Sequence, residues 1–225
     1  MLRQLIEYLM RSALRDAFSR VAWAGPVPET APDRPLVLYA NHHDFYDGYL
    51  LWLACRDVLG RPALTWMEAW DRYPFFAAVG AHPFPPDDAR RRVATLRRTA
   101  RWLHRHPATA LVYFPEGRLH PPDEGLLPID TAALAHLDRL LPGVMWCPVG
   151  LHVTRTGAPR PEARLAAGPV HPHPDGHETH RIEALLARLR ALPPGSGRTL
   201  LTGRHRPDRW NFGFLRGYFA RYLDP

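Results

Sequence analysis

The chain has 225 residues, a formal net charge of +7 and 25 prolines, and all 29 of its basic residues are arginine. This length suits one α/β domain with a sizeable buried core. The arginines are spread over several segments, without a basic-aromatic ladder or a zinc module, which argues against a nucleic-acid partner. The charge favours anionic partners instead, such as phospholipid head groups, phosphorylated small molecules or an acidic carrier protein.

The N-terminal segment is predicted to be an amphipathic helix within residues 1–25. Apolar side chains recur at helical spacing over 2–22, and the arginines lie mostly off this stripe. Such a helix suits a membrane interface, and it equally suits packing on its own domain. A proline-rich linker leads into the main domain, predicted at 26–195. Neither a secretory signal nor a membrane-spanning helix is expected, and Cys55 and Cys147 are expected to be buried free thiols.

Strands and helices alternate through the main domain, which predicts one α/β domain with a mixed, mostly parallel sheet flanked by helices. The predicted strands are 36–40, 63–66, 79–84, 110–114, 145–153 and 163–167. The predicted helices are 46–56, 68–77, 88–106, 129–141 and 178–192. In such sheets, ligand sites gather in the loops at the carboxyl ends of the strands.

The first of these loops carries the sequence NHHDFYD at 41–47. Residues five apart on one α-helix point in different directions, so His42 is expected in the turn after the strand and Asp47 in the first turn of the next helix. A carboxylate on one ring nitrogen of a histidine orients the ring and stabilises its cation, as a general base requires. The same spacing also fits a helix-capping aspartate beside a structural histidine.

A second polar loop follows the strand 110–114 and reads FPEGR at 114–118. Proline followed by glycine indicates a tight exit from the strand, and glycine allows close approach of the backbone to a ligand. Glu116 and Arg118 are therefore expected to project toward His42.

Together these residues resemble the glycerolipid acyltransferases of the PlsC type, the family of 1-acylglycerol-3-phosphate acyltransferases. That family shows Asn-His-x4-Asp after a strand, Phe-Pro-Glu-Gly after a later strand, and a Val-Pro-Val-like strand further on. In this chain the corresponding segments are 41–47, 114–117 and the sequence CPVG at 147–150, in the same order. The resemblance spans about residues 1–192 and implies a glycerol-3-phosphate acyltransferase-like fold, with 26–195 as the acyltransferase domain.

The resemblance implies transfer of a fatty acyl group from acyl-CoA or acyl carrier protein to the hydroxyl of a lysolipid acceptor in phospholipid biosynthesis. His42 and Asp47 would form the catalytic pair, with backbone N–H groups near His42 or Gly117 as oxyanion donors. Asn41, Glu116 and Gly117 carry over as substrate-binding residues. No metal or other cofactor is expected. The expected location is the cytoplasmic side of a membrane, bound peripherally to its anionic surface.

Two departures affect recognition of the acceptor. The family usually continues Phe-Pro-Glu-Gly with Thr-Arg-Ser, whereas this chain has Arg118-Leu119-His120. A second family arginine, after the third strand, is replaced by Pro86. Both positions hold the acceptor phosphate in the family. Either other arginines replace them, or the acceptor carries no phosphomonoester. The arginines considered as replacements are Arg90, Arg91, Arg92 and Arg118.

Two further segments leave alternatives open. The sequence HPHPDGHETH at 171–180 resembles a metal-binding cluster and would suit a metal-dependent hydrolase, but its spacings do not match the usual zinc signatures. The segment 196–225 is an aromatic-basic tail that suits either a membrane head-group zone or packing on the domain. A non-catalytic lipid-binding relative is the third possibility.

Overall fold

Eight strands form one sheet in the computed structural model, which describes residues 1–205 and 213–220. The strands are β1 (Arg20–Trp23), β2 (Leu36–Ala40), β3 (Ala63–Met67), β4 (Ala81–Pro83), β5 (Ala110–Tyr113), β6 (Met145–Thr154), β7 (Glu162–Ala167) and β8 (Arg198–Thr202). Their order is β4-β3-β5-β2-β6-β7-β1-β8. Neighbours from β4 to β6 are parallel, as are β7 and β1, whereas β6–β7 and β1–β8 are antiparallel. The predicted mixed, mostly parallel sheet is confirmed.

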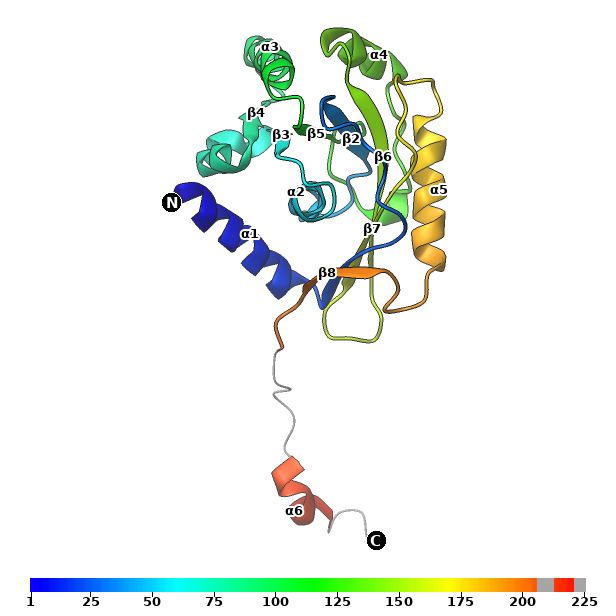
Figure 1. Ribbon diagram of the computed structural model, residues 1–225. Coiled ribbons are helices and arrows are strands. Elements are labelled where there is room, and N and C mark those ends of the chain that lie inside the picture. The colour runs from blue at the N-terminus through cyan, green and yellow to red at the C-terminus, as the bar shows by residue number, and fades with distance from the viewer. Residues whose placement is uncertain (206–212, 221–225) are drawn as a thin grey trace.

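Helices cover both faces of this sheet (Figure 1). The α-helices are α1 (Leu2–Ala17), α2 (Asp47–Asp57), α3 (Ala89–Arg105), α4 (Thr131–Leu140), α5 (Glu178–Ala191) and α6 (Arg216–Ala220). Short 3₁₀ turns lie at η1 (Glu68–Asp71), η2 (Pro74–Val79), η3 (Pro122–Glu124) and η4 (Gly213–Leu215). None of the described helices is both long and apolar enough to cross a lipid bilayer.

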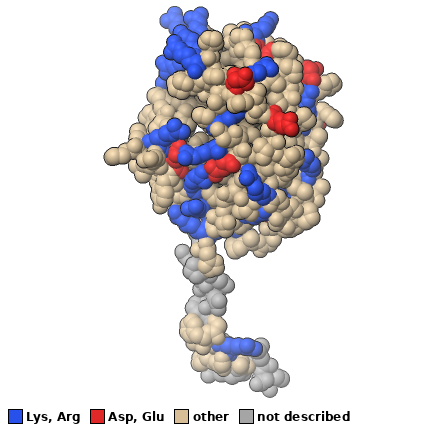
Figure 2. Space-filling view, in the orientation of Figure 1, with Lys and Arg blue, Asp and Glu red and all other residues tan. Residues whose placement is uncertain are grey.

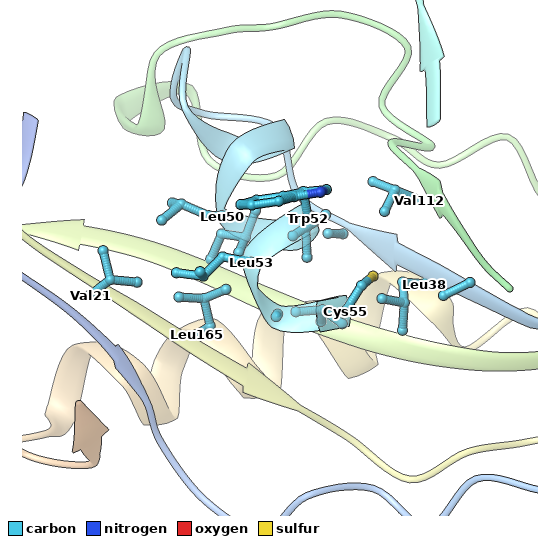
Figure 3. Packing of buried hydrophobic residues seen from close by; sticks show 14 of the residues in the cluster. Val21, Leu38, Leu50, Trp52, Leu53, Cys55, Val112 and Leu165 are labelled. Atoms are coloured by element: carbon cyan, nitrogen blue, oxygen red, sulfur yellow. The ribbon is translucent and has the colours of Figure 1, made fainter. Parts of the chain in front are cut away.

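The central strand β2 has a core on each side because its side chains alternate between the two faces. Leu36, Leu38 and Ala40 belong to the core under α1 and α2, whereas Val37 and Tyr39 belong to the core under α3, α4 and α5. Figure 3 shows Leu50 and Leu53 of α2 packed with the sheet residues of the first core. The site loop after β2 therefore leaves a strand that is fully buried on both faces.

Three parts of the chain differ from the prediction. The N-terminal helix ends at Ala17, because Phe18 is extended and the next residues enter the sheet as β1 between β7 and β8. The predicted helix 68–77 is instead the two 3₁₀ turns η1 and η2, which have a break before Pro74. Strand β8 lies outside every predicted element. Long-range pairing, which local periodicity does not reveal, accounts for β1 and β8.

Two further predictions concern the cysteines and the C-terminal tail. Cys55 and Cys147 are free and buried, as predicted, and burial raises the pKa of each thiol to about 12. Of the aromatic-basic tail, residues 206–212 and 221–225 lie outside the described part of the chain. In its described part, the side chains of Phe214 and Tyr218 are exposed.

Candidate functional site

A histidine and a carboxylate meet at the carboxyl end of β2. His42 lies in the turn after the strand and Asp47 is the first residue of α2, as the spacing predicts. The Nδ1 atom of His42 is 3.2 Å from Oδ2 of Asp47. Nε2 of His42 makes no hydrogen bond to any residue described, and the side chain is 23% exposed. The ring can therefore accept a proton on Nε2 while Nδ1 donates to the carboxylate.

Asp47 is held as the partner of His42 by the backbone of the loop itself. Its Oδ2 atom accepts from the amides of His43 at 2.7 Å and Asp44 at 2.8 Å. Burial raises the pKa of this carboxyl, and the contacts with His42 and the Asp44 amide act in the opposite direction. Its place in the first helical turn also favours a negative charge. The aspartate fixes the loop that leads into α2 and orients the histidine at once.

The loop after β5 closes over the same histidine. The Phe114 ring stacks on the His42 ring with centroids 4.1 Å apart and an interplanar angle of 16°. Oε1 of Glu116 accepts the His42 amide at 2.6 Å. Gly117 adopts a φ of +74°, which suits glycine, and a Cβ added there would meet open space. The structure thus brings the two predicted loops together. The positive φ of Gly117 suits the turn, and its predicted contact with the substrate remains a prediction.

Glu116 is the centre of a buried network. Its Oε2 atom accepts the Leu127 amide at 2.7 Å and lies 2.6 Å from Nε2 of His120. Nδ1 of His120 faces the Pro121 carbonyl at 3.1 Å. Carboxylates and carbonyls only accept hydrogen bonds, so these contacts favour protons on both ring nitrogens of His120 and a buried ion pair with Glu116. The amide of His120 also donates to the His42 carbonyl at 3.2 Å.

Asn41 and His43 tie the loop to β6 and to the next loop. The Asn41 side chain donates to the Leu151 carbonyl at 2.9 Å and accepts from the Leu151 amide at 2.8 Å, which fixes its orientation. Its amide nitrogen then faces Nδ1 of His43 at 3.2 Å, so His43 carries its proton on Nε2 and donates to the Gly125 carbonyl. Burial lowers the pKa of His43. The side chain of Asn41 is fully buried in this network. Its contact with the substrate remains a prediction.

His43, Glu116 and His120 have ligand atoms within 4.8 Å of one another, a spacing that a divalent cation could use. The hydrogen bonds argue against this use. A metal on Nε2 of His43 would move its proton to Nδ1, which faces the Asn41 amide donor. The 2.6 Å contact between Glu116 and His120 would also have to open. We interpret the three side chains as a hydrogen-bond network that supports the His42 loop.

An apolar cavity of about 520 Å³ lies beside His42. Its walls come from α1, α2, β3 and the turns η1 and η2, and both His42 and Phe114 line it. Among the described residues that line it, Glu68 is the only one with an acidic side chain, and none is an arginine. Cavities of this size and character accommodate apolar ligands with a few polar anchors.

The comparisons with known proteins bear on this fold. No protein-family model and no curated protein matches the sequence. Among solved structures, the chain is similar to the 1-acyl-sn-glycerophosphate (LPA) acyltransferase PlsC from Thermotoga maritima. The TM-score is 0.56 at 20% identity, over 83% of this chain and 77% of that one. The chain has this acyltransferase's fold.

The arginines predicted to hold an acceptor phosphate do not converge on His42. Arg91 forms a bidentate pair with Asp71 on η1, and Arg118 pairs with Glu124 at 2.9 Å. Arg92 donates to the Pro86 carbonyl, and Arg90 is exposed on α3. Their roles in acceptor binding stay predictions, because the first three would have to leave partners on this chain.

The histidine-rich segment 171–180 also does not assemble into a metal cluster within the described residues. Nε2 of His171 is 3.0 Å from the Tyr39 hydroxyl, and His173 pairs with Asp138. Asp175 forms a bidentate pair with Arg181, which holds the pKa of that carboxyl well below its usual range. These side chains connect the segment to β2, α4 and α5 rather than to one another.

Proposed function

We propose that the protein is an O-acyltransferase that moves a fatty acyl group from a thioester donor to the hydroxyl of a lysolipid. The donor is acyl-CoA or acyl carrier protein, and the acceptor is 1-acylglycerol-3-phosphate or a related lysolipid. One observation carries the proposal: His42 lines an apolar cavity, and the buried carboxylate of Asp47 orients its ring. The fold similarity to an acyltransferase supports it.

The proposed reaction needs no acyl-enzyme, because the acceptor oxygen is the nucleophile. Nε2 of His42 takes the hydroxyl proton as that oxygen attacks the thioester carbonyl. Asp47 stabilises the imidazolium that forms. When the tetrahedral intermediate collapses, the C–S bond breaks and the imidazolium returns its proton to the leaving thiolate. The products are the ester and the free thiol.

The oxyanion of that intermediate needs donors that are still free. The amides of residues 42, 43 and 44 are engaged by Glu116 and Asp47, and the Gly117 amide donates to the Phe114 carbonyl. The expectation that these flanking amides stabilise the oxyanion therefore requires rearrangement of the loop. We include such a rearrangement on substrate binding in the proposal.

The deciding experiment is a thiol-release assay with acyl-CoA and with acyl carrier protein, read together with lipid mass spectrometry. The acceptor panel should pair lipids that differ only in the phosphomonoester, such as 1-acylglycerol-3-phosphate and 1-acylglycerol. We expect acyl transfer that depends on acceptor and on His42. Thioester hydrolysis alone, or no turnover with any pair, would contradict the proposal, and the latter would favour a non-catalytic lipid-binding protein.

We propose that the cavity holds the donor acyl chain, and Gly48 allows a direct test. Gly48 lines the cavity on the first turn of α2, and a Cβ added there meets no atom within 4 Å. Gly48→Leu should fill the space beside His42 and lower kcat/KM for long-chain donors by at least about tenfold, since each buried methylene is worth ~0.8 kcal/mol.

Gly48→Ala is the matched control for this variant, because it adds a single methyl group. Both variants should fold at least as stably as the wild type, since glycine is a poor helix former. The measurement is kcat/KM for donors of increasing chain length, together with Tm. Equal loss for short and long donors would place the acyl chain elsewhere.

A peripheral membrane location is also part of the proposal. Ile6, Met10 and Leu14 face the core, and beside that stripe α1 exposes a second apolar band. The band consists of Leu2, Leu5, Tyr8 and Leu9, each 49–60% exposed. Exposed Phe45 and Phe75 line the cavity together with Leu9. A bilayer in contact with this band would bring lipid acceptors to the cavity mouth.

Leu2→Ser combined with Leu5→Ser should weaken binding to anionic vesicles by at least about tenfold, because two exposed apolar anchors are lost. Val27→Ser is the control, since Val27 is similarly exposed at 47% but lies in the linker after β1. Vesicle co-sedimentation measures the effect. Unchanged binding of the double variant would remove α1 from the membrane contact.

A further inference from the structure

Helix α3 carries an unusual concentration of positive charge. It contains seven of the 29 arginines and no acidic residue. Five of these arginines are exposed and make no hydrogen bond or ion pair with a described residue. The five are Arg90, Arg97, Arg98, Arg101 and Arg105. Figure 2 shows the resulting blue patch over α3, at the upper left of that view.

This concentration of positive charge destabilises α3 itself. Residues 90–92, all arginine, occupy the first turn, where the helix dipole disfavours positive charge. Arg97 and Arg101 are four residues apart, as are Arg101 and Arg105, so like charges face each other along the helix. Acidic side chains at these spacings would have relieved the repulsion, and α3 has none. An uncompensated local conflict of this kind is typical of a functional surface.

The start of α3 lies against the wall of the cavity. Arg91 pairs with Asp71 of η1, and its guanidinium lies 5.4 Å from the Trp70 ring centroid. The neighbouring η1 residues Glu68 and Ala69 line the cavity. A partner on α3 would therefore lie beside the site at which the thioester must react.

We propose that the exposed face of α3 binds an acidic protein that carries the acyl donor as a thioester. The inference rests on the proposed acyltransferase function and selects a protein-bound donor over a free coenzyme. From Arg90 to Arg105 the helix advances about 22 Å, and unpaired guanidiniums occur along this whole length. A row of that length matches an acidic helix better than the compact phosphates of one coenzyme.

The exposed apolar residues beside the arginines favour a protein over a membrane. Val93 and Trp102 are exposed by 45% and 46%, and their helical positions place them at the two edges of the arginine face. Arginine together with tryptophan is the usual composition of a protein-interface hot spot. Two isolated apolar side chains are few for insertion into lipid, whereas α1 presents a continuous apolar band.

The test reverses charge in the middle of the patch, away from the cavity wall. Arg97→Glu combined with Arg101→Glu should lower kcat/KM for acyl carrier protein donors by at least tenfold. Turnover of acyl-CoA and co-sedimentation with anionic vesicles should change less than twofold. Arg139→Glu combined with Arg190→Glu is the matched control, with the same change of charge at exposed sites on α4 and α5.

Each other outcome overturns the inference in a distinct way. Equal loss with both donors would assign the patch to coenzyme phosphates or to the reaction itself, and loss of vesicle binding would assign it to the membrane. An equal effect of the control would show a general charge effect. If the wild type turns over neither donor, the proposed function fails. Calorimetric titration with the holo carrier protein then still reports on the surface, and no difference between the wild type and the α3 variant overturns the inference.

Discussion

His42→Ala is expected to lower kcat/KM for acyl transfer by about 10²–10⁴-fold, the usual contribution of a positioned general base. The variant removes Nε2, the ring atom that is free to take the acceptor proton, and it also removes the stack on Phe114. Because the side chain lies at the edge of the cavity and is partly exposed, the fold should persist. Steady-state kinetics and Tm measure both effects.

Asp47→Asn should lower kcat/KM for acyl transfer by about 10²-fold or more, because Asp47 acts through the same base, His42. It keeps a side-chain oxygen for the loop amides but removes the charge that stabilises the imidazolium. In the wild type, kcat/KM should fall as the pH falls, because the base must be unprotonated. Burial raises the pKa of Asp47, so its carboxylate also takes up a proton at a higher pH than an exposed aspartate does. His136→Ala, at an exposed site on α4, is the control, and full activity of either site variant would refute the mechanism.

Glu116→Ala is expected to destabilise the fold by about 3–5 kcal/mol, the usual cost of removing one partner of a buried ion pair. The loss leaves the His42 and Leu127 amides without their acceptor and His120 without its counter-charge. The anchor of the catalytic loop is lost as well, so activity should fall further than stability alone explains. Urea unfolding and kinetics at a temperature where the variant is folded separate the two effects.

Glu116→Gln keeps this prediction testable if the alanine variant does not fold. The amide retains the shape of the side chain but presents one donor where three hydrogen-bond donors now converge. We expect kcat to fall by at least about tenfold, since a small displacement of a reacting group has effects of this size. Glu183→Gln is the control, because Glu183 is exposed on α5 and makes no hydrogen bond or ion pair with a described residue. Wild-type kcat in Glu116→Gln would show that the anchor does not position His42.

The prediction of the fold succeeded where the signal is local. The apolar runs that became β2, β5 and β6 are buried on both sides, so continuous hydrophobicity marks them clearly. Strands β1 and β8 were not predicted, because they pair with segments more than a hundred residues distant in the sequence. In addition, Val21 of β1 continues the apolar helical stripe of α1. Their strand character depends on partners rather than on their own pattern.

The prediction of the site also succeeded where the signal is local and failed where it depends on distant segments. The spacing from His42 to Asp47 and the order of the two loops were sufficient to predict that the loops meet. The ion pair of Glu116 with His120 was not predicted, although a spacing of four residues was a usable signal. The partners of Arg91 and Arg118 depend on where two other segments fold, and no motif encodes that.

The place of β1 in the sheet has a consequence for synthesis. It lies between β7 and β8, and β8 pairs with no other described strand. During translation, residues 20–23 therefore emerge long before either partner exists, while β2 and β5 can already pair. The ribosome-bound chain is expected to hold β1 unpaired until residues 162–167 of β7 have been made. A chaperone or a nearby bilayer would meet the exposed apolar band of α1 in that interval.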